Sequence, residues 1–379
     1  MTHGSIWLIV ECTAGPINRN RGIEHPSFGT LPFLHKEEGT VVGAVGVYVD
    51  DFLFVTELEV MKALVGTIKG FWETTEPQIL GEDGCTELTY LGVQLEVTEG
   101  PWDSLSELWL HQSSYAYVVA DKFQEKRPLA EKKNPGQALN KEDGLRTEST
   151  ADDANLKYCQ RALGSLLWLV TRTRPDLAWA YSVAATMVSL DTKKAAERVR
   201  HMLGYLLKTR ELGLVYKRPH EGLKTINVFA DASFAPTGGK SHGGMVTYVK
   251  GSPVAWKSKR QTVTALSTAE SELIESAEAH VSARPVVLLF GELGQKIETM
   301  FLECDNTAAL SMVGEASLQA WRSRHISIRG SSLDEATKSG EVQYGYCNTK
   351  EQRADGLTKG LSHPDHTRAL EAWSMVEAP

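Results

Sequence analysis

The sequence predicts an α/β protein whose C-terminal third forms a mixed five-stranded sheet flanked by helices. Three β-rich segments follow one another at short spacing over 225–234, 243–251 and 253–259, which is typical of antiparallel strands joined by tight turns. Helical and β-rich segments then alternate toward the C-terminus. This order implies helices packed on a sheet that contains both parallel and antiparallel strands.

The elements of this region follow from local signals. A long helix is predicted from Ser267, because Thr268 with Glu270 and Glu272 just inside gives an N-cap signature. The remaining predicted elements are, in order, a strand over 301–307, a helix over about 330–338, a strand over 342–348 and a helix from Glu351.

The N-terminal part is predicted as α+β. The segment 41–55 is β-rich with an aspartate pair in its middle, which indicates two strands that meet at a hairpin. Residues 57–72 have apolar side chains at helical spacing. Strands over 87–97 and 106–112 and a helix through Phe123 are expected next, whereas residues 1–40 lack clear periodicity.

The middle of the chain divides into a linker and a helical region. Residues 125–155 are polar and charged, with Pro, Gly and Asn, which is typical of a linker. Residues 156–209 have helical spacing, and Arg174-Pro175 is expected to end a helix, because proline disfavours helical backbone at the residue before it.

Composition excludes several classes of protein. The net charge is −8 and the isoelectric point about 5.8, so a nucleic-acid site must be a local group of basic residues rather than a basic surface throughout. The five cysteines form no CxxC pair and predict neither a disulfide framework nor a zinc site. The longest apolar run, 41–49, is too short to span a bilayer, and the protein is expected to be soluble.

Four carboxylates stand at positions that converge in such a fold. Asp231 lies within the first strand, Glu272 in the long helix, Asp305 after a later strand, and Asp355 near the start of the last helix. Strand ends and helix starts meet at one edge of an α/β sheet. Clustered carboxylates repel unless cations lie between them, and oxygen ligands suit two Mg²⁺ or Mn²⁺ ions. The alternative is that each acid is a surface charge or a carboxylate that stabilises a helix start.

A resemblance to a known family sharpens this prediction. The segments FADASFA, VAWKSKRQTVTALSTAESELIESAEA, LECDNTAAL, RSRHISIR and EQRADGLTKGL resemble, in order and spacing, the RNase H signatures of copia-type retrotransposon Pol polyproteins. The resemblance implies that the four acids bind the catalytic metal ions. Glu270 is the rival for the helix position, and SerGluLeu favours Glu272.

The same resemblance implies further site residues. His325 corresponds to a family histidine with a role in product release or proton transfer, although a basic residue on a loop facing nucleic acid is an equal reading. Ser327 departs from the aspartate that the family often has there. Basic residues that could contact a hybrid are Lys257, Lys259, Arg260, Arg322, Arg324 and Arg329, with a merely solvated face as the alternative. For Trp256, a core role is favoured over contact with a sugar.

A second segment, YVDD over 48–51, resembles the palm hairpin of reverse transcriptases in the same family, with Asp50 and Asp51 as remnant metal ligands. A polar turn between core strands is the alternative. No aspartate precedes Asp50, so we expect the polymerase half to be a remnant that does not synthesise DNA alone. With this resemblance the predicted domains are an N-terminal remnant with little structure (1–40), a partial palm (41–124), a linker (125–155), a helical connection (156–220), an RNase H-like domain (221–362) and a C-terminal helix or tail (363–379).

The expected function is a ribonuclease with two Mg²⁺ or Mn²⁺ ions that cleaves the RNA strand of RNA–DNA hybrids. The alternative is a degenerate remnant that at most binds nucleic acid. A third hypothesis is that upstream polyprotein segments complete the chain in trans. No membrane partner is expected. The location is expected to be intracellular, either cytoplasmic or nuclear, and the resemblance implies work in cytoplasmic particles before nuclear integration.

Overall fold

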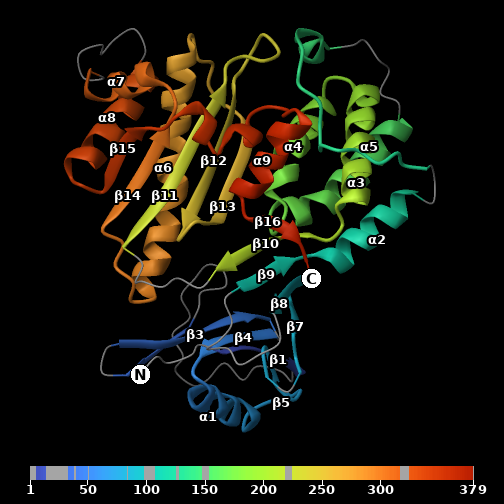
Figure 1. Cartoon of the computed structure of the whole chain (residues 1–379), viewed down its shortest axis with the longest axis vertical. Helices are drawn as coiled ribbons and strands as arrows, with labels where there is room; N and C mark the ends of the chain where they lie inside the picture. The colour runs from blue at the N-terminus through green and yellow to red at the C-terminus, as the bar shows by residue number, and fades with distance from the viewer. Residues whose placement is uncertain are drawn as a thin grey trace. The chain divides into compact units, whose positions relative to one another are not determined.

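The computed structural model describes residues 6–13, 33–37, 40–49, 51–82, 84–97, 107–124, 128–146, 153–217, 224–315 and 324–378. The chain forms two compact units (Figure 1). The first contains residues 1–111 with 216–218 and 291–294, and the second contains the remainder. No helix in the described ranges combines the length and the apolar composition that a membrane span needs.

The first unit contains an antiparallel sheet with the strand order β2-β3-β4-β1-β5, and β6 also pairs with β1. Met61 and Val65 lie one turn apart on its helix and are buried with Val45 and Phe54 of the sheet. The elements are β1 (Ile6–Thr13), β2 (Phe33–Glu37), β3 (Thr40–Tyr48), β4 (Asp51–Thr56), α1 (Leu58–Lys69), β5 (Glu73–Thr74) and β6 (Gln78–Ile79).

Two sequence predictions for this unit can be compared with the structure. The hairpin predicted within 41–55 is confirmed, because β3 and β4 pair from Gly43 opposite Thr56 to Tyr48 opposite Asp51. Residues 1–40 were expected to have little structure, whereas the structure has strands β1 and β2 there. Strand β1 pairs with β4 along six residues, so its partner lies far along the chain, which local periodicity does not reveal.

A second sheet segment of this unit is an antiparallel meander of β7 (Glu87–Tyr90), β8 (Val93–Val97) and β9 (Glu107–His111). One of its faces is apolar and buries Leu88, Leu95 and Val97 beside Leu80. The alternation of side chains along a strand leaves polar residues on the opposite face.

The second unit begins with helices. They are α2 (Ser113–Gln124), α3 (Asp153–Val170), α4 (Ala178–Met187) and α5 (Thr192–Lys208), with the short 3-10 helices η1 (Lys141–Gly144) and η2 (Pro175–Leu177). Helix α3 ends before Pro175, as the sequence predicts. Proline occupies the first position of η2, where its missing N–H has no helical partner to lose.

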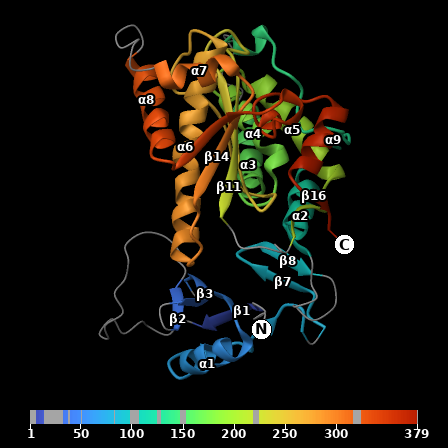
Figure 2. The ribbon, with the colours of Figure 1, turned by 60° about the vertical axis from the view of Figure 1, so that its left-hand side comes forward.

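The C-terminal part of this unit contains the predicted mixed five-stranded sheet, which is confirmed. Its order is β13-β12-β11-β14-β15, with β11, β12 and β13 antiparallel and β11, β14 and β15 parallel. Figure 2 shows this sheet between α6 and the helices α3 to α5. The elements are β11 (Thr225–Ser233), β12 (His242–Val249), β13 (Ser252–Arg260), α6 (Thr268–Glu292), β14 (Thr299–Cys304), α7 (Thr307–Glu315), α8 (Arg324–Lys338) and β15 (Val342–Tyr346).

The predicted helix from Glu351 is wrong. The structure has two 3-10 helices there, η3 (Thr349–Glu351) and η4 (Asp355–Leu357), and α9 (His363–Ala372) begins later. Gly356 disfavours a continuous helix, and Ser362 caps a new one by accepting the backbone N–H of Asp365. Strand β16 (Met375–Glu377) then pairs with the start of β10 (Leu212–Lys217).

A buried polar network joins η2, α5 and α9. The Arg174 guanidinium donates to both oxygens of Asp176, at 2.9 and 2.7 Å, and to the carbonyl of Thr209 at 2.8 Å. Tyr205 donates to Asp176 at 2.8 Å, and His366 Nε2 lies 2.9 Å from the Tyr205 hydroxyl. Burial alone would raise the pKa of Asp176, but the Arg174 charge holds it below its ordinary value. Both members of the pair are therefore charged inside the unit.

Removal of one charge from this pair should strongly destabilise the protein. Arg174→Met leaves Asp176 buried and uncompensated, at a cost of about 3–5 kcal/mol in the free energy of unfolding. Arg172→Met is the matched control, since Arg172 is exposed and stacks on Trp168, and it should cost less than about 1 kcal/mol. Urea denaturation measures both, and equal costs would contradict the role assigned to the network.

Candidate active site

Asp231 lies near the end of β11, directly opposite Gly244 in β12. Its side chain is buried, and Thr358 Oγ1 donates a hydrogen bond to its Oδ2. Gly244 makes this contact possible, because a Cβ there would lie 2.7 Å from the Cβ of Leu357. The segment that contains η4 therefore packs directly on the backbone of β12, which places Thr358 beside the strand.

Glu272 enters the same region from α6. It is buried, and the backbone N–H of Ala232, next to Asp231, donates to its carboxylate. Cys304, the last residue of β14, has its Sγ 3.8 Å from Glu272 Oε2. Asp305 follows directly, and ligand atoms of Glu272, Cys304 and Asp305 all lie within 4.8 Å of one another.

Asp355 is the first residue of η4 and completes the group. It lies close enough to Asp231 for the negative charge of each to affect the other. Lys359 Nζ lies 2.8 Å from Asp355 Oδ1. The structure thus brings together Asp231, Glu272, Asp305 and Asp355, which we call the acid quartet.

The electrostatics of the acid quartet show how closely its members interact. Burial, and then the negative charges of Asp231 and Asp305, raise the pKa of Glu272 to about 9. Burial and the charge of Asp355 raise the pKa of Asp231 to about 6. Burial also raises the pKa of Asp355, against the opposing effect of Lys359. Each shift disfavours the negative form, as expected of carboxylates that crowd together without a cation between them.

These residues fit divalent cations by the chemistry of their donors. Every carboxylate supplies oxygen ligands, which hard cations prefer. Cys304 is not an expected ligand, because burial and the Glu272 charge raise the pKa of its thiol to about 12 and keep it neutral. The raised pKa values of Asp231, Glu272 and Asp355 show that nearby cationic side chains do not fully balance the negative charge of the group.

Lys359 supplies part of that charge, and the sequence analysis missed it. Burial lowers the pKa of Lys359, but the charges of Asp231, Asp355 and Asp305 outweigh this effect and raise it. Its ammonium group is therefore a fixed cation beside the quartet. The signal was present in the sequence, since Thr358 and Lys359 stand three and four residues after Asp355 and so return to its side of a helical turn.

Glu275 is a buried acid that the sequence analysis also missed. It lies one turn after Glu272 on α6, and burial raises its pKa to about 7. A Cβ at Gly243 would lie 1.7 Å from its Oε2, so glycine is required where α6 packs against β12. Gln261 Nε2 lies 3.4 Å from the same oxygen.

The predicted basic residues do not share one face. Lys257 and Lys259 are two residues apart on β13 and so share one face of the sheet. Arg260 is next to Lys259 and therefore projects from the opposite face. Lys259 pairs with Glu278 of α6 at 2.9 Å, and Arg329 lies 3.6 Å from the same carboxylate. Trp256 has a structural contact, because its indole N–H donates to the carbonyl of Val170 at 2.8 Å.

The other predicted site residues lie partly outside the described residues. Arg322 and Asp50 are outside them, as are the side chains of Arg324 and His325 at the start of α8. Asp51 is the first residue of β4 and is partly exposed. The roles predicted for these residues stay predictions.

The chain is similar in sequence to retrotransposon Pol polyproteins. It is 28% identical over 319 residues to the retrovirus-related Pol polyprotein from transposon TNT 1-94 of Nicotiana tabacum, which covers 83% of this chain and 23% of that protein. It is 27% identical over 205 residues to the Pol polyprotein from transposon RE1 of Arabidopsis thaliana, covering 53% of this chain and 14% of that protein. The Ty1-ER2 Gag-Pol polyprotein of Saccharomyces cerevisiae is 22% identical over 322 residues, covering 83% of this chain and 18% of that protein.

Two further comparisons complete this result. A solved N-terminal RNase H domain from Mycobacterium tuberculosis, studied as a fusion with maltose-binding protein, matches 39% of this chain and 98% of that chain at 12% identity and a TM-score of 0.27. No family model matches the chain. The chain spans less than a quarter of the length of the curated relatives described above. The resemblance noted in the sequence is confirmed: the curated homologues of this chain are copia-type retrotransposon Pol polyproteins, and they align with most of its length.

Proposed function

We propose that the chain is a ribonuclease that cleaves the RNA strand of RNA–DNA hybrids with two Mg²⁺ or Mn²⁺ ions held by the acid quartet. The observation that carries this proposal is the convergence of four acids from separate parts of the chain, namely Asp231 of β11, Glu272 of α6, Asp305 after β14 and Asp355 of η4. The copia-type Pol relatives support it, because such polyproteins are the source of the RNase H signatures that the sequence resembles.

The residues of this chain would have the following roles. Asp231 is the central ligand, since it interacts with Asp355 on one side and with Glu272 on the other. Two bound divalent ions would supply activation of a water and stabilisation of the leaving oxygen. Thr358 orients Asp231 through its hydrogen bond, and the Ala232 N–H orients Glu272. The pair Lys257 and Lys259 would contact the phosphate backbone, and upstream polyprotein segments are candidate partners.

A specific observation also supports the alternative, a remnant that catalyses nothing. Lys359, whose Nζ lies 2.8 Å from Asp355 Oδ1, neutralises part of the quartet's charge from within the chain. Isothermal titration of the full chain with MgCl₂ or MnCl₂ separates the two functions, because the remnant would show no binding heat.

Asp231→Asn should abolish hybrid cleavage. Replacement of a ligand should reduce the rate by about a hundredfold or more, because loss of a group that only orients a ligand already costs about ten- to a hundredfold. A labelled RNA–DNA hybrid with Mg²⁺ measures the rate, with duplex DNA as the substrate control. Asp334→Asn is the matched protein control, since Asp334 pairs only with Lys338 on the surface of α8. Cleavage that survives Asp231→Asn would assign the chemistry to other acids.

The metal-free protein should lose stability as the pH rises. Glu272 has an ordinary pKa of 4.5 and a folded pKa of about 9, so the folded state holds a proton that the unfolded state has released. This stabilisation is complete below pH 4.5 and is lost as the pH rises through about 9. The free energy of unfolding should therefore fall across this window, by at most about 1.4 kcal/mol per pH unit for one proton.

Urea denaturation in EDTA at several pH values measures this slope. Glu272→Gln should remove most of the slope above pH 7, where Asp231 and Glu275 contribute little, and Glu270→Gln on the same helix should retain it, which also separates the two candidates for the helix ligand. A slope that Glu272→Gln leaves unchanged would place the raised pKa on another group.

Replacement of Lys359 should strengthen metal binding. In Lys359→Met the fixed cation no longer opposes the entry of a divalent ion, so the affinity for Mn²⁺ should rise about tenfold, the effect of one nearby unit charge at high effective dielectric constant. Lys338→Met is the control, because Lys338 forms the same i,i+4 pair with an aspartate on the surface, at 2.6 Å. Isothermal titration measures both, and weaker binding in Lys359→Met would make the lysine a partner of the bound ion instead.

A further inference from the structure

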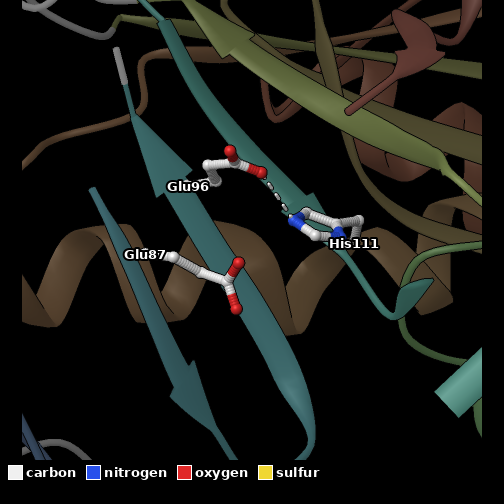
Figure 3. Close-up of side chains that lie close together, drawn as sticks. All are labelled: Glu87, Glu96 and His111. Atoms are coloured by element: carbon white, nitrogen blue, oxygen red, sulfur yellow. Dashed lines mark hydrogen bonds and ion pairs between the residues drawn. The ribbon is translucent and has the colours of Figure 1, made fainter. Parts of the chain in front are cut away.

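The polar face of the β7-β8-β9 meander gathers potential metal ligands in the first unit. Glu87 and Glu96 are directly opposite each other on β7 and β8, and His111 of β9 is opposite Gln94, two residues along β8. Residues that pair, and residues two apart on one strand, share a face. Figure 3 shows the two carboxylates and the imidazole gathered on this face.

The distances between these side chains match those around one small cation. His111 Nε2 lies 3.1 Å from Glu96 Oε2, and the ligand atoms of Glu87, Glu96 and His111 all lie within 4.8 Å of one another. Ligands bound at about 2.0–2.2 Å around a tetrahedral ion lie about 3.3–3.6 Å apart. Small side-chain rotations therefore suffice for all three atoms to reach a common ion.

The burial of the group differs from that of an ordinary surface charge cluster. The His111 side chain is 3% exposed, and that of Glu96 18%. Gln94, also buried, donates from Nε2 to Glu87 Oε1 at 2.9 Å and holds that carboxylate toward the group. Like charges directly opposite on antiparallel strands repel, so a cation between Glu87 and Glu96 would convert a destabilising pair into a stabilising one.

Trp109 provides an independent observation on the same face. It is directly opposite Glu96 and is buried, and its indole N–H has no hydrogen-bond partner among the described residues. A buried donor without an acceptor costs about 1–3 kcal/mol. A carboxylate oxygen that does not bind the ion, or a hydroxide formed from a zinc-bound water, would be an acceptor for this N–H.

We propose that Glu87, Glu96 and His111 form a zinc site with a water in the fourth position. One imidazole and two carboxylates favour Zn²⁺ over Mg²⁺, because imidazole suits zinc whereas Mg²⁺ prefers oxygen ligands alone. The ion would join three neighbouring strands and so stabilise the meander. This site is separate from the acid quartet, which belongs to the other compact unit, and it does not depend on the ribonuclease proposal.

Isothermal titration of the EDTA-treated full chain with ZnCl₂ tests the site by difference. The wild-type chain should bind one Zn²⁺ more than Glu87→Gln and His111→Gln, or bind it at least about tenfold more tightly, whatever the quartet binds. Glu59→Gln is the matched control, because Glu59 is an exposed glutamate of the same unit that pairs with Lys62, and this variant should bind zinc as the wild type does.

Glu87 is exposed, so its replacement tests the site even where a change at the buried His111 prevents folding. Titration with Co²⁺ adds a spectroscopic measurement, since four-coordinate cobalt absorbs visible light strongly and this absorption should be lost in Glu87→Gln. Zinc stoichiometry and affinity that are the same in Glu87→Gln and Glu59→Gln would overturn the proposal.

Discussion

The mutual repulsion of four clustered carboxylates, of which Asp231 and Glu272 are buried, is the constraint on which the second unit is built. Such a group persists only where the backbone forces its members together, and two glycines of β12 permit this. Gly244 admits the segment around η4 against the strand, and Gly243 admits α6. A side chain at either position would have to displace Leu357 or Glu275. The approach of Asp355 and Glu272 to Asp231 is thus set by backbone packing rather than by attraction among the acids.

The protein compensates this repulsion in two different ways. Lys359 brings a positive charge to Asp355, and Glu272 retains a proton until the pH reaches about 9. Both compensations are reversible, since an ammonium group on a flexible side chain can move and a proton can leave. A divalent ion would therefore replace charge that the site already carries in another form, and its binding would release protons. This exchange distinguishes the quartet from a group of acids fixed by permanent salt bridges.

The sequence predicted the sheet from local patterns, and the four acids that it singled out lie near one another in the structure. The alternation of apolar and polar residues along 225–259 indicates strands, and the sequence also indicates that a strand ends near Asp305. It failed where the outcome depends on distant packing. The helix expected from Glu351 is replaced by η3 and η4. The spacing of Lys359 from Asp355 is visible in the sequence, but its position beside Asp231 depends on η4 lying on β12, a contact between segments more than a hundred residues apart. The grouping of Arg260 with Lys259 failed for a local reason, because neighbouring residues of a strand point to opposite faces.

The helical region and the C-terminal helix together hold η4 in place, so the active-site geometry depends on residues that carry no chemistry. The ring of Trp373 is fully buried against Gly356, and its indole N–H donates to the carbonyl of Arg353 at 2.9 Å. A Cβ at Gly360 would lie 2.7 Å from the ring of Trp179, so α4 packs closely against the segment that follows η4. The Arg174 network connects α9 to α5. A substitution that breaks this network should therefore also make η4 less well fixed, and with it Asp355 and Lys359. The helices before the sheet are therefore part of the structure that positions the acid quartet.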